Sequence, residues 1–289
     1  MTTLITPTEL ADLLAGDAPV RLLDVRWALT QPDGRESFAD GHIPGAVYVD
    51  LETELTDHSV TGRGRHPLPS GSALQEALRR WGIDEGDTVV AYDDWNRAGS
   101  SRAWWVLRAA GLPDVRILDG GFGGWLESGG SVEYGREYRH ADDRIGNVTV
   151  AHEDLYAGAL PTLSAEEAAR IAEKGVLLDA RAPERFRGEL EPVDPVAGHI
   201  PGAVNLPSTS VLDDDGAFVA PEKLRARFAK RGVEPGAGAG APTGAYCGSG
   251  VTAAVLVAAA EAAGIELALF PGSWSQWSAD PDNPVATGE

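Results

Sequence analysis

The sequence predicts an α/β protein built from two tandem copies of one fold, each with a central parallel sheet flanked by helices. Two observations carry this prediction. Four motifs occur twice in the same order, and short apolar runs alternate with segments of helical periodicity. Short apolar strands separated by helices are typical of a parallel sheet that is covered on both faces. The length of 289 residues also favours two domains over one.

Each repeated motif recurs 152 to 157 residues further along the chain. The pairs are LLDVR and LLDAR (22–26 and 177–181), GHIPGAVYVD and GHIPGAVNLP (41–50 and 198–207), VVAYDD and TGAYCG (89–94 and 243–248), and DGGFGGW and PGSWSQW (119–125 and 271–277). The preserved order and the nearly constant spacing indicate a duplication. We therefore predict an N-terminal domain at 1–140, a linker at 141–154 and a C-terminal domain at 155–289.

The elements of the second copy follow from local signals. Ser164 and Glu167 form the pattern of a capping box, which predicts a helix start. Further along, Pro221 in a first turn and Gly232 at an end delimit another helix. The remaining predictions are a strand at 175–180, a turn and strand at 198–207, a helix at 221–232, a loop at 232–244, a strand at 243–247 and a helix at 251–263. The last helix has almost no polar face, so we expect it to be buried.

Composition excludes several classes of partner. The chain has 44 acidic and 24 basic residues, and its net charge of -20 repels nucleic acid and anionic membranes. No apolar run approaches the roughly 18 residues that span a bilayer, and the N-terminus lacks the pattern of a signal peptide. A single cysteine excludes an internal disulfide and suggests a reducing compartment. We therefore expect a cytoplasmic protein, and we expect it to be a monomer.

The most informative short stretch surrounds the only cysteine, Cys247. It ends the strand at 243–247, and the helix at 251–263 starts a few residues later. Ligands of parallel α/β sheets bind at the carboxyl ends of strands, where helix N-termini point. The intervening glycines let several backbone N–H groups converge on an anion, so we expect a nucleophilic thiolate there. The alternative is a buried structural cysteine, which the repeat disfavours because the first copy has Asp93 at this position.

The motifs together resemble those of the two-domain sulfurtransferases of the rhodanese superfamily. The resemblance spans essentially the whole chain and includes both GHIPGA turns, DARAPERFRG at 179–188, CGSGVTA at 247–253 and GSWSQW at 272–277. It implies an active site in the C-terminal domain, a persulfide on Cys247, and an N-terminal domain without an active cysteine. Family members with an uncharged CGSGVTA loop use 3-mercaptopyruvate, whereas a loop such as CRKGVTA suits thiosulfate.

The resemblance also implies a set of site residues. Arg185 would bind the carboxylate of the donor, and Arg102 would be either a second carboxylate ligand or part of a salt bridge between the domains. Ser249, His66 and Glu52 would form a proton relay like that of hydrolytic triads, although a solvated loop position is the alternative for His66. The amides expected to hold the persulfide belong to the loop and the helix start, and include those of Gly248, Gly250, Val251, Thr252 and Ala253.

The implied reaction is a double displacement with small-molecule substrates. Sulfur passes from 3-mercaptopyruvate to Cys247 with release of pyruvate, and then to a thiol, a thioredoxin-type acceptor or cyanide. No cofactor is needed, and we expect no metal because a single cysteine cannot build a thiolate site. His42 and His199 recur in both copies, so we interpret them as structural residues that cap a turn carbonyl.

Three alternatives remain beside this reading. A thiosulfate:cyanide sulfurtransferase is the nearest, and Val193, standing where some mercaptopyruvate enzymes have a further arginine, weakens the donor assignment. A cysteine phosphatase would need an arginine six residues after the cysteine, where this chain has Ala253. A non-enzymatic sulfur carrier or docking protein is the third.

Overall fold

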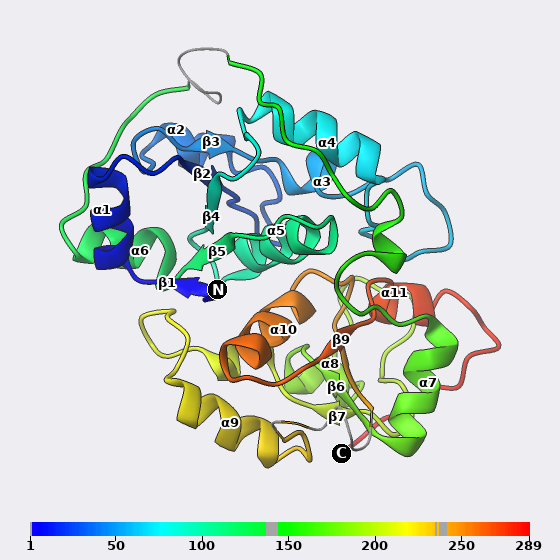
Figure 1. Cartoon of the computed structure of the whole chain (residues 1–289). Helices are drawn as coiled ribbons and strands as arrows, with labels where there is room; N and C mark the ends of the chain where they lie inside the picture. The colour runs from blue at the N-terminus through cyan, green and yellow to red at the C-terminus, as the bar shows by residue number, and fades with distance from the viewer. Residues whose placement is uncertain (1, 137–143, 235, 237–241) are drawn as a thin grey trace. The chain divides into compact units, whose positions relative to one another are not determined.

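A computed structural model of the chain describes residues 2–136, 144–234, 236 and 242–289 (Figure 1). The chain divides into two compact units. Unit 1 comprises Met1–Asp57, Leu68–Leu160 and Asp214–Phe218, and unit 2 comprises His58–Pro67, Pro161–Asp213 and Val219–Glu289. Parts of the predicted linker at 141–154 and of the predicted loop at 232–244 lie outside the described residues. The domain boundaries predicted from the repeats stay a prediction.

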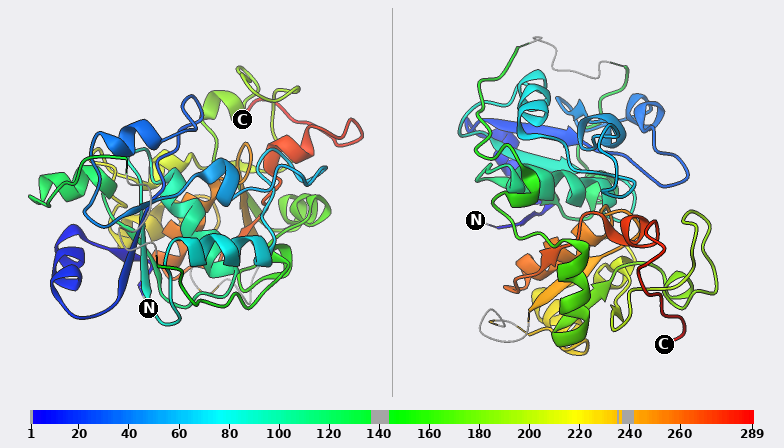
Figure 2. Two further views of the ribbon diagram at one scale, coloured as in Figure 1. Left: turned by 90° about the horizontal axis from the view of Figure 1, so that it is seen from above. Right: turned by 90° about the vertical axis from the view of Figure 1, so that its right-hand side faces the viewer.

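Unit 1 is built on a parallel sheet with the strand order β1-β5-β4-β2-β3. Its strands are β1 (Leu4–Ile5), β2 (Val20–Asp24), β3 (Val47–Tyr48), β4 (Thr88–Tyr92) and β5 (Val115–Leu118). Its helices are α1 (Pro7–Ala15), α2 (Arg35–Ala39), α3 (Leu51–Glu54), α4 (Gly71–Arg80), α5 (Ala98–Ala109), α6 (Gly121–Glu127) and the 3-10 helix η1 (Leu155–Ala157). Figure 2 shows these helices on both sides of the sheet, as the apolar character of the strands requires.

Unit 2 repeats this plan with a parallel sheet in the order β7-β6-β8-β9. Its strands are β6 (Val176–Asp179), β7 (Val204–Asn205), β8 (Thr243–Tyr246) and β9 (Ala268–Leu269). Its helices are α7 (Ala165–Lys174), α8 (Pro183–Phe186), α9 (Pro221–Ala229), α10 (Ala253–Ala262), α11 (Ser273–Trp277) and the 3-10 helix η2 (Ser208–Val211). The predicted α/β fold with two parallel sheets is confirmed.

The helix boundaries and the buried helix that local sequence signals predicted in unit 2 can be compared with the structure. The hydroxyl of Ser164 accepts the amide of Glu167, and the Glu167 carboxylate accepts the amide of Ser164, so the predicted capping box is confirmed. Pro221 stands in the first turn of α9. Gly232 lies three residues after the last residue of this helix and has a left-handed backbone conformation with φ +82. Residues 253–260 of α10 are buried, as the absence of a polar face predicted.

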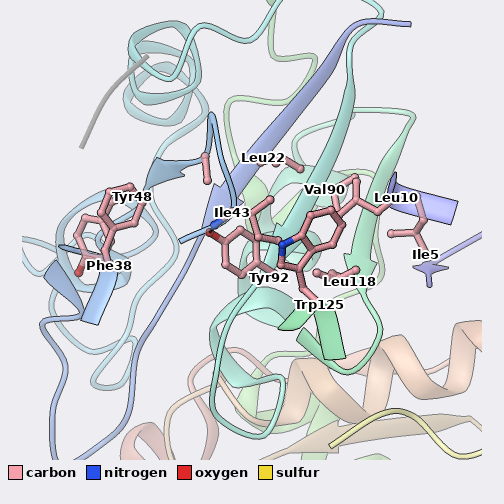
Figure 3. Packing of buried hydrophobic residues seen from close by; sticks show 11 residues of the cluster. Ile5, Leu10, Leu22, Phe38, Ile43, Tyr48, Val90, Tyr92, Leu118 and Trp125 are labelled. Atoms are coloured by element: carbon pink, nitrogen blue, oxygen red, sulfur yellow. Dashed lines mark hydrogen bonds between the residues drawn. The ribbon is translucent and has the colours of Figure 1, made fainter. Parts of the chain in front are cut away.

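The duplication extends to individual side chains. The hydroxyl of Tyr92 accepts the amide of Ile43 at 3.1 Å, and the Tyr246 hydroxyl accepts the amide of Ile200 at the same distance. In the buried cluster of unit 1, Tyr92 lies next to Ile43 and Trp125 (Figure 3). The two tyrosines therefore tie the end of an inner strand to the GHIPGA turn in each unit.

The two histidines of the GHIPGA turns make the same contacts in both units. Nδ1 of His42 lies 2.9 Å from the carbonyl oxygen of Phe38, and Nδ1 of His199 lies 2.7 Å from that of Phe186. Each imidazole also stacks on the ring of the same phenylalanine, with a centroid distance of 3.7 Å in both units. Each imidazole thus lies within hydrogen-bond distance of a backbone carbonyl, as predicted, but that carbonyl belongs to a short helix, α2 or α8, and not to the turn. That neither histidine is catalytic stays a prediction. In the part of the chain that the structure describes, no helix is both long and apolar enough to cross a membrane.

Candidate active site

Cys247 stands directly after β8, at the carboxyl end of an inner strand of the unit 2 sheet. Its side chain is buried, and its Sγ accepts a hydrogen bond from the amide of Gly250 at 3.1 Å. The helix α10 begins six residues later, after Val251 and Thr252. The sulfur therefore has a backbone donor and precedes a helix N-terminus, where negative charge is favoured. Gly250 is the predicted amide donor that the structure brings to the sulfur; the roles of the other predicted amides stay predictions.

Close backbone packing fixes the shape of the cysteine loop. Gly250 has φ +82, and a Cβ on it would lie 2.2 Å from the carbonyl oxygen of Pro271, so only glycine fits there. The Cys247 amide donates to the hydroxyl of Ser273 at 3.0 Å. The amides of Trp274 and Ser275 in turn donate to the carbonyls of Cys247 and Gly248. The start of α11 thus holds the loop from one side.

Ser249 and His66 meet in unit 2. The Ser249 hydroxyl lies 2.7 Å from Nδ1 of His66, and both side chains are buried. They come together because the segment His58–Pro67 belongs to unit 2, although the chain on either side of it belongs to unit 1. Gly64 allows this approach, since with φ +85 a Cβ there would lie 2.4 Å from the carbonyl oxygen of Gly272. Part of the predicted relay is therefore in hydrogen-bond contact, and its chemical role stays a prediction.

Arg185 lies beside the cysteine loop and is held by two carboxylates. Its Nε and Nη2 donate to Glu191 at 3.2 and 2.6 Å, and Nη2 also lies 3.4 Å from Asp194. Its Nη1 faces Gly248, at 3.4 Å from the position that a Cβ of that glycine would take. The bidentate pairing with Glu191 leaves the guanidinium in one orientation, with an N–H edge toward the residue next to Cys247.

Glu191 is the residue that organises this cation. Burial raises the pKa of Glu191, but hydrogen bonds from Arg185 and from the amides of Asp194 and Val193, with the charge of Arg185, outweigh burial and hold that pKa below its usual range. Arg181 also approaches Glu191 at 3.4 Å, while its main partner is Asp179 at 2.6 Å. The carboxylate therefore stays ionised at neutral pH and fixes its arginine partners.

Sequence reasoning missed three residues of this site. Arg65, next to His66, pairs with Asp194 at 2.7 Å and points Nη2 toward Gly248, and Glu191 and Asp194 hold Arg185. The only signal in the sequence was the position of Arg65 beside the candidate His66 and of the two acids in the EPVDP stretch after Arg185.

The other two predicted residues lie in unit 1. Glu52 is in α3, where its carboxylate accepts a hydrogen bond from Nε1 of Trp27 at 2.6 Å. Arg102 is fully buried in α5, and its Nη2 donates to the carbonyl oxygen of Leu55 at 3.0 Å. The predicted roles of Glu52 in the relay and of Arg102 toward the donor stay predictions.

The described geometry suits nucleophilic chemistry by a cysteine on an anionic substrate. The sulfur has an amide donor, a serine–histidine pair lies in the same loop region, and fixed guanidinium groups face the neighbouring glycine. Among the described residues, no group of three or more histidine, cysteine, aspartate and glutamate side chains is arranged to hold a metal ion.

Comparison with known proteins agrees with this class of site. The rhodanese-like domain matches residues 6–128 and 164–280, one match in each copy. The chain is 56% identical to the putative thiosulfate sulfurtransferase SseB of Mycobacterium tuberculosis, over 99% of this chain and 97% of that protein. It is 41% identical to the probable 3-mercaptopyruvate sulfurtransferase of Pseudomonas aeruginosa, over 99% and 98% of the two chains.

Solved structures give the same result. The crystal structure of SseA from Escherichia coli, described as a 3-mercaptopyruvate sulfotransferase, is similar with a TM-score of 0.79 and 30% identity. The similarity covers 95% of this chain and all of that chain. This protein therefore belongs to the rhodanese family, with two tandem rhodanese-like domains, and its activity is that of a sulfurtransferase. Such an activity requires a sulfur donor and a sulfur acceptor.

Proposed function

We propose that the protein moves the sulfur of 3-mercaptopyruvate to Cys247 and from there to a thiol, a thioredoxin-type dithiol or cyanide, releasing pyruvate. The observation that carries this proposal is the position of Cys247 Sγ, which accepts the Gly250 amide next to a glycine faced by the Arg185 guanidinium. The cysteine loop itself has no charged side chain. A donor with a single carboxylate therefore needs one cation, and that cation must come from outside the loop. Arg185 supplies that cation.

In the first half-reaction the Cys247 thiolate attacks the sulfur atom of the donor. The new S–S bond forms as the C–S bond of the donor breaks, and the electron pair of that bond leaves with carbon as the enolate of pyruvate. The enolate takes a proton from the Ser249 hydroxyl, and His66 returns a proton to Ser249 across their 2.7 Å contact. The products are pyruvate and a persulfide on Cys247.

In the second half-reaction the acceptor attacks the outer sulfur of the persulfide. The bond between the two sulfur atoms breaks, and its electron pair returns to Sγ as the thiolate. The amide of Gly250 stabilises that thiolate in the same way before and after each cycle. Because the two substrates react in turn with one sulfur atom, the proposal implies ping-pong kinetics.

Thiosulfate is the second candidate donor. Two observations favour it: the 56% identical relative is named a putative thiosulfate sulfurtransferase, and two guanidinium groups rather than one face Gly248. A dianion would gain from both cations. The two donors share the chemistry of an anion that carries a transferable sulfur, so the distinction between them is quantitative.

Initial rates with both donors, at equal enzyme and with one thiol acceptor, test the assignment. We expect kcat/KM for 3-mercaptopyruvate to exceed that for thiosulfate by about tenfold or more. The reason is that thiosulfate brings one more negative charge to a cysteine loop that has no cationic side chain. Parallel lines in double-reciprocal plots against acceptor concentration would support the double displacement. A higher kcat/KM for thiosulfate would overturn the donor assignment.

We also propose that the protein works as a cytoplasmic monomer without a nucleic-acid or membrane partner. The single cysteine supports a reducing compartment, and the net charge of -20 disfavours polyanionic partners. Size-exclusion chromatography with light scattering would test the oligomeric state.

A further inference from the structure

A cavity of about 220 Å³ lies in unit 1, and all the residues that line it belong to that unit. Its walls include Arg26 and Trp27, which come shortly after β2, and Asp94 and Trp95, which come shortly after β4. These strands are neighbours in the sheet, and the chain leaves β2 toward β3 on one side and β4 toward β5 on the other. Parallel α/β sheets bind ligands at such a topological switch point. The cavity therefore lies where this unit would hold a ligand.

The equivalent place in unit 2 is that of the cysteine loop. The repeated motifs align Asp94 with Gly248 and Trp27 with Ala182. Two guanidinium groups face Gly248 in unit 2, whereas unit 1 has a carboxylate at the aligned position and an aromatic ring in place of a methyl group. The same place in the fold therefore has the opposite charge in unit 1, where a cation suits it better than an anion.

Two tryptophan rings meet at this cavity. The ring centroids of Trp27 and Trp95 lie 6.3 Å apart with an interplanar angle of 64°. Nε1 of Trp27 donates to the carboxylate of Glu52 at 2.6 Å, which fixes the orientation of that ring. Trp27 is buried, whereas Trp95 is 39% exposed. Because the face of a tryptophan attracts a cation within about 6 Å of the ring, the pair offers an aromatic surface to a positively charged ligand.

Asp94 supplies a negative charge without a close partner. Its one ion-pair partner among the described residues is Nε of Arg26 at 3.7 Å, which is longer than a hydrogen bond. Arg26 has a nearer partner in Asp24, at 3.1 Å. The other carboxylate at the cavity, that of Asp33, pairs with Arg35 at 3.2 Å. The charge of Asp94 is thus the one that a bound cation would balance.

We propose that unit 1 binds a small alkylated ammonium ion in this cavity, with its charge beside Asp94 and its alkyl groups on the rings of Trp27 and Trp95. Tryptophan faces favour a cation that carries its charge on alkyl groups, because such a cation is weakly hydrated and can touch the rings. This site is distinct from that of Cys247, and the proposal does not depend on the identity of the sulfur donor.

The first test compares choline with 3,3-dimethyl-1-butanol, which has the same shape and no charge. Saturation-transfer NMR titrations of the methyl signals, with the full chain, give both Kd values. Burial raises the pKa of Asp24 to about 7 and also raises that of Asp94, so a pH of about 8 keeps these carboxylates ionised. We expect choline to bind at least about tenfold more tightly, because only the cation gains from Asp94 and from the ring faces.

Two substitutions locate the binding site. Asp94→Asn removes the charge at constant size, and Trp95→Leu removes a ring from a partly exposed position, with circular dichroism to verify folding. We expect each to weaken choline binding by about 5- to 30-fold, and Asp94→Asn to change the Kd of the alcohol by less than about twofold. The matched control is Asp12→Asn, which removes an equal charge from an exposed position of α1 and should bind choline as wild type does.

A competition experiment separates a site for alkylated cations from counter-ion exchange at a carboxylate. We expect tetramethylammonium to displace choline, and potassium at the same concentration to displace much less, because its hydration shell keeps it away from the rings. Equal displacement by the two ions would overturn the proposal. So would the absence of saturable choline binding, equal Kd values for choline and the alcohol, or unchanged choline binding in Asp94→Asn or Trp95→Leu.

Discussion

The two units carry the same scaffold but place different groups at the end of the inner strand. In unit 1 the residue after β4 is Asp93, whose carboxylate accepts the amide and hydroxyl of Ser100, both at 2.8 Å, and the amide of Trp95. Arg97 pairs with the same carboxylate at 3.1 Å. In unit 2 the residue after β8 is Cys247, whose sulfur accepts the amide of Gly250. Both loops therefore hold an acceptor of hydrogen bonds, which is a carboxylate in unit 1 and a thiol in unit 2.

The cations are arranged differently as well. In unit 1 Arg97 is buried inside its loop and packs onto Gly121, where a Cβ would clash with the guanidinium. In unit 2 Arg65 and Arg185 lie outside the cysteine loop, tied back by Asp194 and Glu191, with N–H groups toward Gly248. The carboxylate in the loop of unit 1 is thus paired with a cation of its own loop, whereas the cations at the loop of unit 2 come from outside it and face Gly248, where we propose that the substrate binds.

The comparison separates what the scaffold needs from what the chemistry needs. The tyrosine at the strand end, the histidine of the GHIPGA turn and the arginine after the LLD strand make equivalent contacts in both units, for example Arg26 to Gly41 and Arg181 to Gly198. These residues serve folding. The side chains of Asp93 and Cys247, after β4 and β8, do not share their contacts, and we assign the sulfur chemistry to the unit 2 set.

The largest effect that we predict is a loss of stability in unit 1 when Asp93 is replaced. Asp93→Ala removes the partner of a buried arginine, and breaking a buried ion pair costs about 3–5 kcal/mol. We expect thermal or urea unfolding to show that loss while kcat and KM, measured well below the melting temperature, stay within about twofold of wild type.

Asp93→Asn serves as the control because it keeps the size of the side chain and an oxygen acceptor, so its loss should be smaller. If Asp93→Ala abolished turnover without lowering the melting temperature, the assignment of this loop to structure alone would be wrong.

A smaller effect is expected on the chemical step in unit 2. Ser249→Ala removes the hydroxyl that lies 2.7 Å from His66, and we expect kcat with 3-mercaptopyruvate to fall by about 10²-fold. KM should change little, since the hydroxyl acts on the departing enolate rather than on the bound donor. Stopped-flow measurement of pyruvate release, with circular dichroism to verify folding, would test this.

The contrasting result would be an unchanged kcat in Ser249→Ala. It would show that the proton reaches the enolate by another route, and the contact with His66 would then be structural.

Most of the scaffold could be predicted from the sequence because its determinants are local or repeated. The capping box at Ser164, the buried character of α10 and a strand from residue 243 are set by neighbouring residues, although the strand ends at Tyr246, one residue earlier than predicted. The duplication then distinguished His42 and His199 from catalytic groups, since a residue present in both copies serves what the copies share.

The ion pair between Arg65 and Asp194 could not be predicted from the sequence, because it joins segments far apart in the chain. Arg65 lies 129 residues before Asp194, and their ion pair depends on the return of His58–Pro67 to unit 2. No periodicity or local motif in the sequence indicates that this segment belongs to unit 2. The roles of Glu191 and Asp194, which orient Arg185, could not be predicted either. In the sequence, an acidic residue in a polar turn gives the same pattern whether its carboxylate faces solvent or a guanidinium.

The central claim is that Cys247 carries the transferred sulfur. Intact-protein mass spectrometry after mixing the enzyme with 3-mercaptopyruvate, without acceptor, tests it most directly. We expect a gain of one sulfur atom, located on Cys247 by peptide mapping, reversed by a thiol acceptor and absent in Cys247→Ser, whose turnover should fall by at least about three orders of magnitude. Pyruvate release without any mass gain, or continued turnover by Cys247→Ser, would contradict the account.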